Sequence, residues 1–322
     1  MLRSTLLVLA VLATQVPPPS PEGAPTTPAL RRLLDDGGRV EQVATNFQFA
    51  DGPVWVDGAL VFTDAPRGQL LRWRAGEEPA VIADESGGAS GLALDASARL
   101  IVAERDRRRV SRREDGEVAS LLERVGDTPL NGPTDVALAP DGTLYIADAP
   151  LPSDRTGAAG RIVRVSRTGV AEVVVEGLSR PSGLAVSRDG SELYVADAGR
   201  RDLRAYPLGA GSRLGAPRTL ASIVPWKRGV QGRADGVTLD HGGRVYMAGP
   251  GGIWILEFQA ARPAFFDPRD AGGGTVRLEG FHLAAQKSFP AENDHAVHTR
   301  DNGWGKLRRP AGIEHPPLQH AR

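Results

Sequence analysis

The chain has 322 residues, 39 basic and 39 acidic side chains, and no cysteine. A net charge of zero gives no basic excess for a nucleic-acid partner, and the missing cysteines exclude disulfides, thiol catalysis and thiolate metal sites. The 39 glycines and 25 prolines favour tight turns over long helices.

The first residues predict an export signal. Arg3 supplies a positive charge before an apolar run from Leu6 to Ala13, which is too short to span a bilayer. We expect residues 1–16 to be a signal peptide, so that the mature protein is periplasmic or extracellular and has no membrane partner. A short membrane anchor or a buried start is the alternative. Residues 17–35 are proline-rich and are expected to form an extended linker.

One pattern then recurs five times. Its clearest copy, Thr134 to Asp148, is a short apolar strand, a Pro-Asp-Gly turn and a second strand that ends in an acid. Neighbouring copies begin 39 to 53 residues apart, at Asp51, Ser90, Thr134, Ser182 and Asp235. Repeats of this length that are built from short strands are typical of β-propeller blades, which bury their apolar faces by stacking on one another.

Each copy is followed by apolar segments that predict the outer strands of a four-stranded blade. We expect them at residues 69–74 and 79–83, 109–113 and 118–122, 160–165 and 171–175, 202–206 and 218–221, and 252–256. The protein is therefore predicted to be all-β, a propeller with five legible blades over residues 36–258. An alternating stretch at residues 39–47 could add a strand that closes the ring.

The repeat is absent from the last part of the chain. Residues 259–322 are predicted to form a degenerate or incomplete sixth blade and an irregular tail, which a shift of reading frame in an ancestral blade could explain. His295 and His298 have the spacing of a metal pair, but without a helical pattern a solvated tail fits them better. The sequence leaves open how the ring closes and whether the protein is an oligomer.

The first residue of each copy points to a binding site. Equivalent positions in successive blades form a ring, here at the mouth of the central channel, and all five side chains carry oxygen donors. We call them the mouth residues: Asp51, Ser90, Thr134, Ser182 and Asp235. Hard divalent cations prefer such ligands, and two acids that face one channel are costly without a cation. For each residue taken alone, capping of a strand or turn is the alternative. A glycine follows four of the five and would permit close backbone approach.

A second set of acids, a charged run and one long loop are weaker candidates for functional residues. A second set of acids ends the second strands, and we place it at the opposite face of the propeller with structural roles: Asp64, Glu104, Asp148 and Asp197. The charged run at residues 105–113 fits a solvated outer hairpin. The loop at residues 226–233 either overhangs the mouth or is a plain surface loop.

The same residues carry a resemblance to the gluconolactonase, senescence marker protein and luciferin-regenerating enzyme family of six-bladed propellers. The resemblance covers roughly residues 44–258, and the phrases that carry it are Asp51-Gly-Pro-Val-Trp55, Leu130-Asn-Gly-Pro-Thr-Asp-Val136, Arg180-Pro-Ser-Gly-Leu-Ala185, Ala234-Asp-Gly-Val237 and Arg107-Arg-Arg-Val-Ser-Arg112. It implies one divalent metal in the channel, calcium first, with zinc, manganese or magnesium as alternatives. It implies metal ligands at Asp51, Ser182 and Asp235, with Thr134 contributing to the metal or the substrate.

The chain departs from the family at three of these positions. The family has Glu where Asp51 stands and Asn where Ser182 and Thr134 stand, so that only Asp235 keeps the family residue. Shorter side chains keep the charge but lose reach, and water must fill more of the coordination shell. We therefore expect a weaker or shifted metal site.

Two functions follow. The first is a metal-dependent hydrolase that opens a small, sugar-type lactone with metal-activated water. In it Asp235 is the catalytic residue, Asp51, Ser182 and Asp235 hold the metal, and Thr134 and Ser90 bind the substrate. The alternative is a non-catalytic exported propeller that binds a small molecule or a protein at the same mouth.

Overall fold

A computed structural model describes most of the propeller. It covers residues 44–256 apart from residues 45, 155–156, 210–212, 226–231 and 251, together with the strand segments 6–12, 258–259, 262–263, 294–297 and 302–306. Of the predicted closing strand at residues 39–47, only residues 44, 46 and 47 are described, and they are not in a strand. The side chains of His295 and His298, most of the tail and the linker lie outside the description, so the expectations for them stay predictions.

The described chain is all-β, with one helical turn, η1 (Ala65–Arg67). Four sheets have four strands in sequential order. They are β2 (Ala50–Val56), β3 (Ala59–Asp64), β4 (Gln69–Trp73) and β5 (Ala80–Ala83); β6 (Ala89–Leu94), β7 (Leu100–Glu104), β8 (Arg109–Glu114) and β9 (Glu117–Leu122); β12 (Pro133–Leu138), β13 (Leu144–Asp148), β14 (Gly160–Val165) and β15 (Ala171–Leu178); and β16 (Pro181–Val186), β17 (Glu192–Asp197), β18 (Asp202–Pro207) and β19 (Arg218–Ser222). A fifth sheet has three strands, β20 (Val237–Leu239), β21 (Val245–Gly249) and β22 (Gly252–Leu256).

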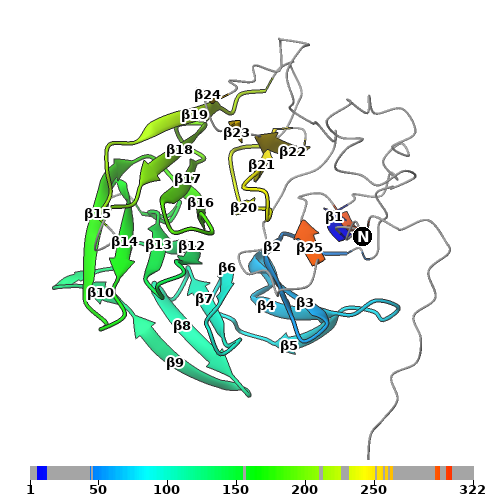
Figure 1. The fold of residues 1–322 in the computed structure, drawn as a ribbon. Coiled ribbons are helices and arrows are strands. Elements are labelled where there is room, and N and C mark those ends of the chain that lie inside the picture. Colours follow the sequence, from blue (N-terminus) through cyan, green and yellow to red (C-terminus); the bar gives the residue numbers. More distant parts are fainter. Residues whose placement is uncertain are drawn as a thin grey trace, which may run out of the picture.

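These sheets are the blades of a propeller. The first strand of each blade faces the centre of the ring and the last lies outside (Figure 1). The five blades are those that the repeat predicts, and the outer strands begin and end within three residues of the predicted bounds.

Shorter pieces complete the described structure. A two-stranded hairpin, β10 (Arg124–Val125) and β11 (Thr128–Pro129), precedes the third blade, and β23 (Phe258–Gln259) pairs with β24 (Arg262–Pro263). A three-stranded sheet has the order β25 (Asp294–Val297), β1 (Leu6–Leu12), β26 (Asn302–Lys306). It lies between the fifth and first blades, and β25 contacts β2 (Figure 1). No further complete blade is present among the described residues.

The core lies between the blades rather than within them. One apolar cluster joins the first and second blades, among them Val54, Leu70, Leu92 and Val102. Further clusters join the second to the third blade, the third to the fourth and the fourth to the fifth. A further cluster, which includes Phe62 and Trp73, lies on the other face of the first blade. Because the second to fourth sheets bury both faces against their neighbours, a single blade is stable only as part of the ring.

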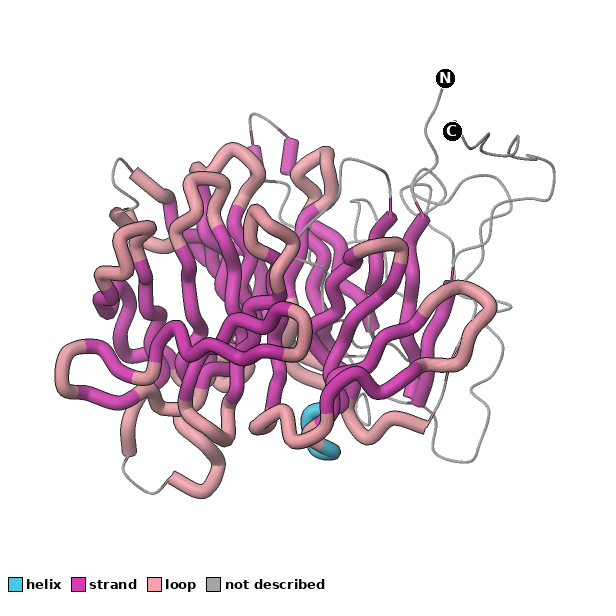
Figure 2. Tube along the Cα trace, turned by 90° about the horizontal axis from the view of Figure 1, so that it is seen from below, coloured by secondary structure: helices cyan, strands magenta, loops and turns pink. Residues whose placement is uncertain are grey.

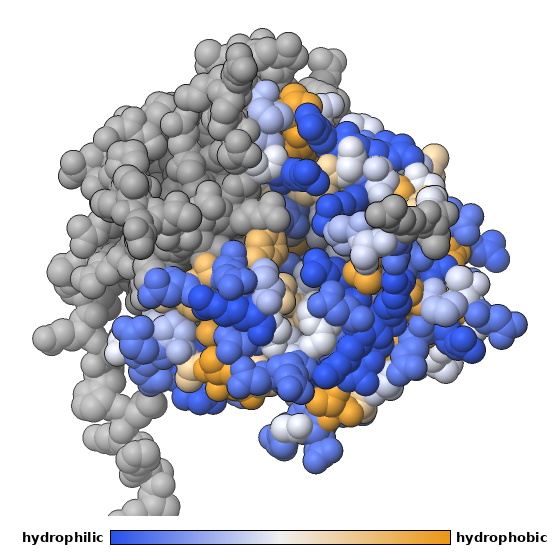
Figure 3. Space-filling model, turned by 180° about the vertical axis from the view of Figure 1, so that it is seen from behind, coloured by the Kyte–Doolittle hydropathy of each residue, from blue (hydrophilic) through white to orange (hydrophobic). Residues whose placement is uncertain are grey.

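The strands run between two ends of the ring, with connections at both ends (Figure 2). Hydrophilic residues cover much of the described surface in Figure 3, with apolar residues in small groups between them. In the described chain no helix has the length and hydrophobicity needed to cross a bilayer.

Candidate functional site

All five mouth residues line one pocket. Its volume is about 800 Å³, and residues of η1, Ala65 and Pro66, also border it. Its other lining residues come from the connections at the same end of the blades. The structure therefore brings Asp51, Ser90, Thr134, Ser182 and Asp235 together at one end of the central channel, as the repeat predicts.

An irregularity in the strand register positions the mouth residues. In the second to fourth blades the pairing of the first two strands shifts across the mouth residue, for example between Pro133 and Asp135 and between Pro181 and Gly183. In the first blade the shift follows Asp51, which itself pairs with Thr63. Such a bulge leaves one residue outside the regular ladder and redirects its side chain. In the fifth blade Asp235 precedes β20, and its backbone nitrogen donates to the Ala248 carbonyl at 3.0 Å.

Asp51 and Ser90 are coupled across the first two blades. The Ser90 hydroxyl donates to Asp51 Oδ2 at 2.6 Å, and the Gly52 nitrogen donates to Asp51 Oδ1 at 2.8 Å. Ser90 is buried and Asp51 is half-buried. With its proton committed to Asp51, the Ser90 oxygen faces other groups only as an acceptor.

Thr134 and Ser182 make equivalent bonds to the next blade. The Thr134 hydroxyl donates to the Pro181 carbonyl at 2.9 Å, and the Ser182 hydroxyl donates to the Ala234 carbonyl at 2.9 Å. Each hydroxyl carries one proton, so both oxygens are also left with acceptor capacity alone. Thr134 and Ser182 thus have the structural role, bonding to backbone carbonyls near strand ends, that was the alternative to a binding site. They line the pocket as well.

Glycines let the first strands of neighbouring blades approach closely. A Cβ atom on Gly52 would lie 2.4 Å from the Ser90 carbonyl oxygen, and one on Gly183 would lie 2.3 Å from the Asp235 carbonyl oxygen. A Cβ on Gly91 would lie 1.9 Å from Asp135 Oδ1. The predicted close approach is confirmed at these three positions.

The second set of acids lies at the mouth end, and the prediction that placed it at the opposite face is wrong. Ala50 pairs with Asp64, Pro133 with Asp148 and Pro181 with Asp197. In an antiparallel hairpin the end of the second strand lies beside the start of the first, so both rings of residues share one end of the blade.

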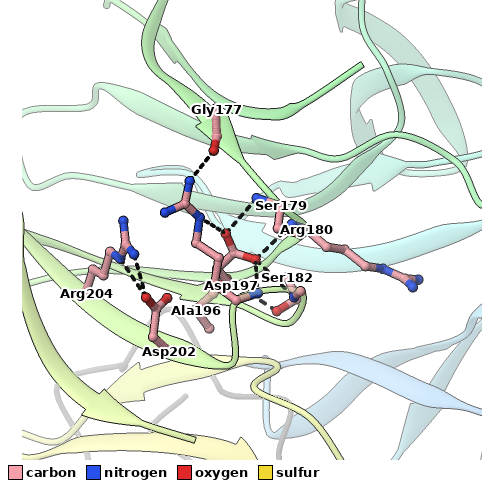
Figure 4. A network of polar contacts seen from close by, with 10 residues as sticks. Gly177, Ser179, Arg180, Ser182, Ala196, Asp197, Asp202 and Arg204 are labelled. Atoms are coloured by element: carbon pink, nitrogen blue, oxygen red, sulfur yellow. Dashed lines mark hydrogen bonds and ion pairs between the residues drawn. The ribbon is translucent and has the colours of Figure 1, made fainter. Parts of the chain in front are cut away.

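The structural role expected for these acids is confirmed. Asp148 accepts from the backbone nitrogens of Asn131 and Gly132, at 3.0 and 2.9 Å, just before Thr134. Asp197 accepts from the nitrogens of Ser179 and Arg180, both at 2.8 Å, just before Ser182 (Figure 4). Asp64 binds the nitrogens of Gln48 and Phe49 in the same way.

Glu104 is held by side chains instead. Its buried carboxylate accepts from Arg109 at 2.7 Å, from Ser111 at 2.6 Å and from Arg113 at 3.0 Å. Burial raises the pKa of Glu104, but these hydrogen bonds outweigh it and hold the pKa below its usual value of 4.5. Part of the charged run that was expected to be solvated therefore neutralises a buried acid.

The donors at the mouth suit a hard cation. All are oxygens: two are carboxylates and three are hydroxyls. Each hydroxyl donates its proton to a protein oxygen, which leaves its own oxygen lone pairs for a ligand. Among the described residues, however, no three His, Cys, Asp or Glu side chains gather as a metal cluster. The set fits a divalent cation that keeps several waters, rather than one enclosed by protein ligands.

Four arginines also line the pocket, and sequence reasoning did not identify them as site residues: Arg105, Arg180, Arg201 and Arg233. They lie in connections at the mouth end, close to the strand ends that the repeat marks, but the arginines themselves do not recur in every blade. The one available signal was the loop at residues 226–233, whose last two residues, Gly232 and Arg233, do border the pocket.

Comparison with known proteins gives a consistent result. The family model described as "SMP-30/Gluconolactonase/LRE-like region" matches residues 49–263. A gluconolactonase from Zymomonas mobilis is 24% identical over 259 residues, which span 71% of this chain and 72% of that protein.

Two solved structures extend the comparison. A gluconolactonase from Xanthomonas campestris is 26% identical and has a TM-score of 0.73, over 93% of this chain and 97% of its own. A calcium-binding protein, regucalcin, from Agrobacterium tumefaciens is 19% identical and has a TM-score of 0.57, over 70% of this chain and 77% of its own. The second likeness concerns the fold alone.

Proposed function

The chain belongs to the SMP-30/gluconolactonase/LRE-like family, and from that premise we propose that it is a hydrolase that opens a small, sugar-type lactone at the channel mouth. The observation that carries the proposal is that five repeat-equivalent oxygen side chains line one pocket of about 800 Å³. The gluconolactonases among its relatives support a lactone as substrate.

The pocket residues divide the work. Asp235 accepts a proton from the water that attacks the lactone carbonyl. The water oxygen bonds to the carbonyl carbon, the ring carbon–oxygen bond breaks, and the proton passes to the released ring oxygen. Ser90 and Thr134, whose own protons are committed, accept hydrogen bonds from the substrate hydroxyls. A polyhydroxylated ring supplies many such donors.

A divalent cation is part of the proposal. Asp51, Ser182 and Asp235 would hold it, with Thr134 close by, and calcium suits these ligands first, ahead of zinc, manganese and magnesium. When bound, it would polarise the lactone carbonyl and lower the pKa of water in the pocket. Regucalcin, which has the same fold, is a calcium-binding protein. The short side chains support weak binding.

Export is proposed on the sequence alone, from Arg3 and the apolar run Leu6 to Ala13. It would place the enzyme where millimolar calcium is available. Weak calcium sites of this kind occur in extracellular modules.

The test is hydrolysis of glucono-1,5-lactone, followed as acid release at constant pH. Asp235→Asn is expected to lower kcat by on the order of a hundredfold or more, because general-base catalysis contributes at least that much. Asp127→Asn makes the same change of charge in the exposed turn between β10 and β11 and should leave kcat unchanged. Equal activity in the two variants would remove Asp235 from the mechanism.

A non-catalytic binding propeller is the second candidate. It is favoured by one observation, the lack of three clustered acids or histidines among the described residues. Binding of a hexose-derived polyol at the mouth, without hydrolysis of any lactone by the folded protein, would support it.

A further inference from the structure

From the charge of the pocket we infer that the substrate carries an acidic group in addition to its lactone ring, such as a carboxylate, a sulfonate or a phosphate. This inference rests on the proposed function for the ring and concerns the remainder of the molecule. The pocket lining has four arginines and two carboxylates, Asp51 and Asp235, so cations outnumber acids by two. A neutral sugar lactone would not balance this excess positive charge.

The arginines come from different chain segments than the two acids. Arg180 and Arg233 lie in the connections that lead into β16 and β20, each two residues before a mouth residue. Arg105 and Arg201 lie in the connections between the second and third strands of the second and fourth blades. The carboxylates stand at the starts of the first strands. The cations and the acids therefore enter the pocket from different segments of the blades, so that a substrate can present its acidic group and its reacting carbonyl to different side chains.

Two of these arginines, Arg105 and Arg201, are not held by a strong ion pair within the described part of the chain. Arg105 is half-buried and pairs with the exposed Asp106 at 3.2 Å, and a pair with such an exposed partner is weak and exchangeable. Within the described part of the chain, the guanidinium of Arg201 has no hydrogen-bond or ion-pair partner.

Arg201 also occupies an unfavourable backbone conformation. Its φ is +59°, in the left-handed region that favours glycine, and the equivalent position in the first blade is Gly68, with φ +64°. Arg108 is the equivalent residue in the second blade, with φ +51°, and there the side chain reaches the Asn131 carbonyl and Asp154. Arg201 carries the same strain while its side chain lines the pocket. Glycine at this position removes the charge and suits the backbone.

The experiment compares three lactones: neutral glucono-1,5-lactone, a hexaric acid lactone with a free carboxylate, and 6-phosphogluconolactone. We expect kcat/KM for an acid-bearing lactone to exceed that for the neutral one by about tenfold or more at low salt, and the ratio to fall as ionic strength rises. The carboxylate and phosphate arms show which acid the pocket prefers.

Two variants locate the effect. Arg201→Gly and Arg233→Gln should each lower the ratio of acid-bearing to neutral kcat/KM on the order of tenfold, since each removes one charge-assisted contact. Arg167→Gln is the control. Its side chain packs beside Gly142, in the turn after β12 at the end of the blade away from the mouth, and the ratio should stay unchanged. Equal kcat/KM for all three lactones, or a ratio that neither pocket variant lowers, overturns the inference and leaves the lactonase standing.

A binding measurement separates this inference from the proposed reaction. If no lactone is hydrolysed, calorimetry with an open-chain hexarate and with the uncharged hexitol decides. Tighter binding of the hexarate, reduced in Arg201→Gly, supports the anion site although the hydrolase proposal fails. Equal binding of the two probes removes the anion site as well.

Discussion

Buried carboxylates fix the positions of the residues at the channel mouth. Asp148 and Asp197 each accept two backbone N–H groups from the segment that leads into the first strand of their own blade. Charge-assisted bonds to backbone are short and strong, and here the accepting carboxylates are fully buried. The side chain two residues further on inherits this placement. The ring of oxygens therefore depends on a second ring of acids, none of which is among the described residues that line the pocket.

Glu104 makes a pH-dependent contribution to stability. Its pKa in the folded protein lies below 4.5, so its contribution is complete above that pH and is lost as the pH falls through the folded value. Glu104→Gln should therefore lower the free energy of unfolding at pH 7 by about 3 kcal/mol, because it leaves Arg109 and Arg113 without their partner. The deficit should shrink as the pH falls below 4. Denaturant unfolding at both pH values measures it.

The control is an exposed ion pair on the next blade. Glu172, which pairs with Arg164 at the surface, is about half exposed. Glu172→Gln should change the free energy of unfolding by less than about 1 kcal/mol at either pH. If the two variants behave alike, the buried pairing of Glu104 does not stabilise the fold as argued.

At this scale the sequence predicted the mouth residues but not the charges around them. Asp51 and Asp235 were found because they recur at one place in the repeat. Arg201 corresponds to Gly68 and Arg108 in other blades, neither of which lines the pocket, and which loop side chains turn inward is decided by packing that no periodicity records. The misplaced second ring has a simpler cause, since antiparallel pairing alone sets Asp148 beside Pro133.

Among the elements, the first strands of neighbouring blades approach too closely for side chains. Gly183→Ala places a Cβ 2.3 Å from the Asp235 carbonyl oxygen, and a backbone atom cannot turn aside. We expect a loss of about 1–3 kcal/mol in the free energy of unfolding, as for other overpacked sites. Lactone hydrolysis should fall with it, because Asp235 must shift. Thermal unfolding and kcat report the two effects.

Gly209→Ala serves as the matched substitution. Among the described residues, a Cβ there would come within 4 Å of the Arg213 carbonyl oxygen alone, at 3.6 Å, which is an ordinary contact. It should leave both the melting temperature and kcat within error of the parent. If Gly183→Ala has the same melting temperature and kcat as Gly209→Ala, the fourth and fifth blades can move apart without loss of stability.

The strands themselves were predictable because alternation and turn residues agree along each blade. The first and second strands and their turns follow directly from the repeat. The hairpin of β10 and β11 was missed, since two-residue strands carry no period. Residues 226–231 and the tail carry no repeat, and the expectations for them stay predictions.

The molecule as a whole should gain stability from a bound cation. A ligand that binds only the folded ring stabilises it by about 2.7 kcal/mol at one hundred times its dissociation constant. We expect a higher melting temperature in millimolar calcium than in chelator, and a smaller rise in Asp51→Asn. The melting temperature of Asp127→Asn should rise as the parent's does. No shift at millimolar calcium, with a cooperative melt, would favour the metal-free binding propeller.

The hydroxyl bonds between blades have a consequence for how such a protein can change. Ser90, Thr134 and Ser182 each bind the neighbouring blade with the same side chain that faces the pocket. A blade is therefore not an interchangeable module, because replacing one residue for a new ligand also alters a joint between two repeats. Selection or design for a new substrate must therefore restore this contact between blades in the same step. Changes in the loops, for example at Arg201 and Arg233, avoid this because these side chains do not make the hydroxyl bonds between blades.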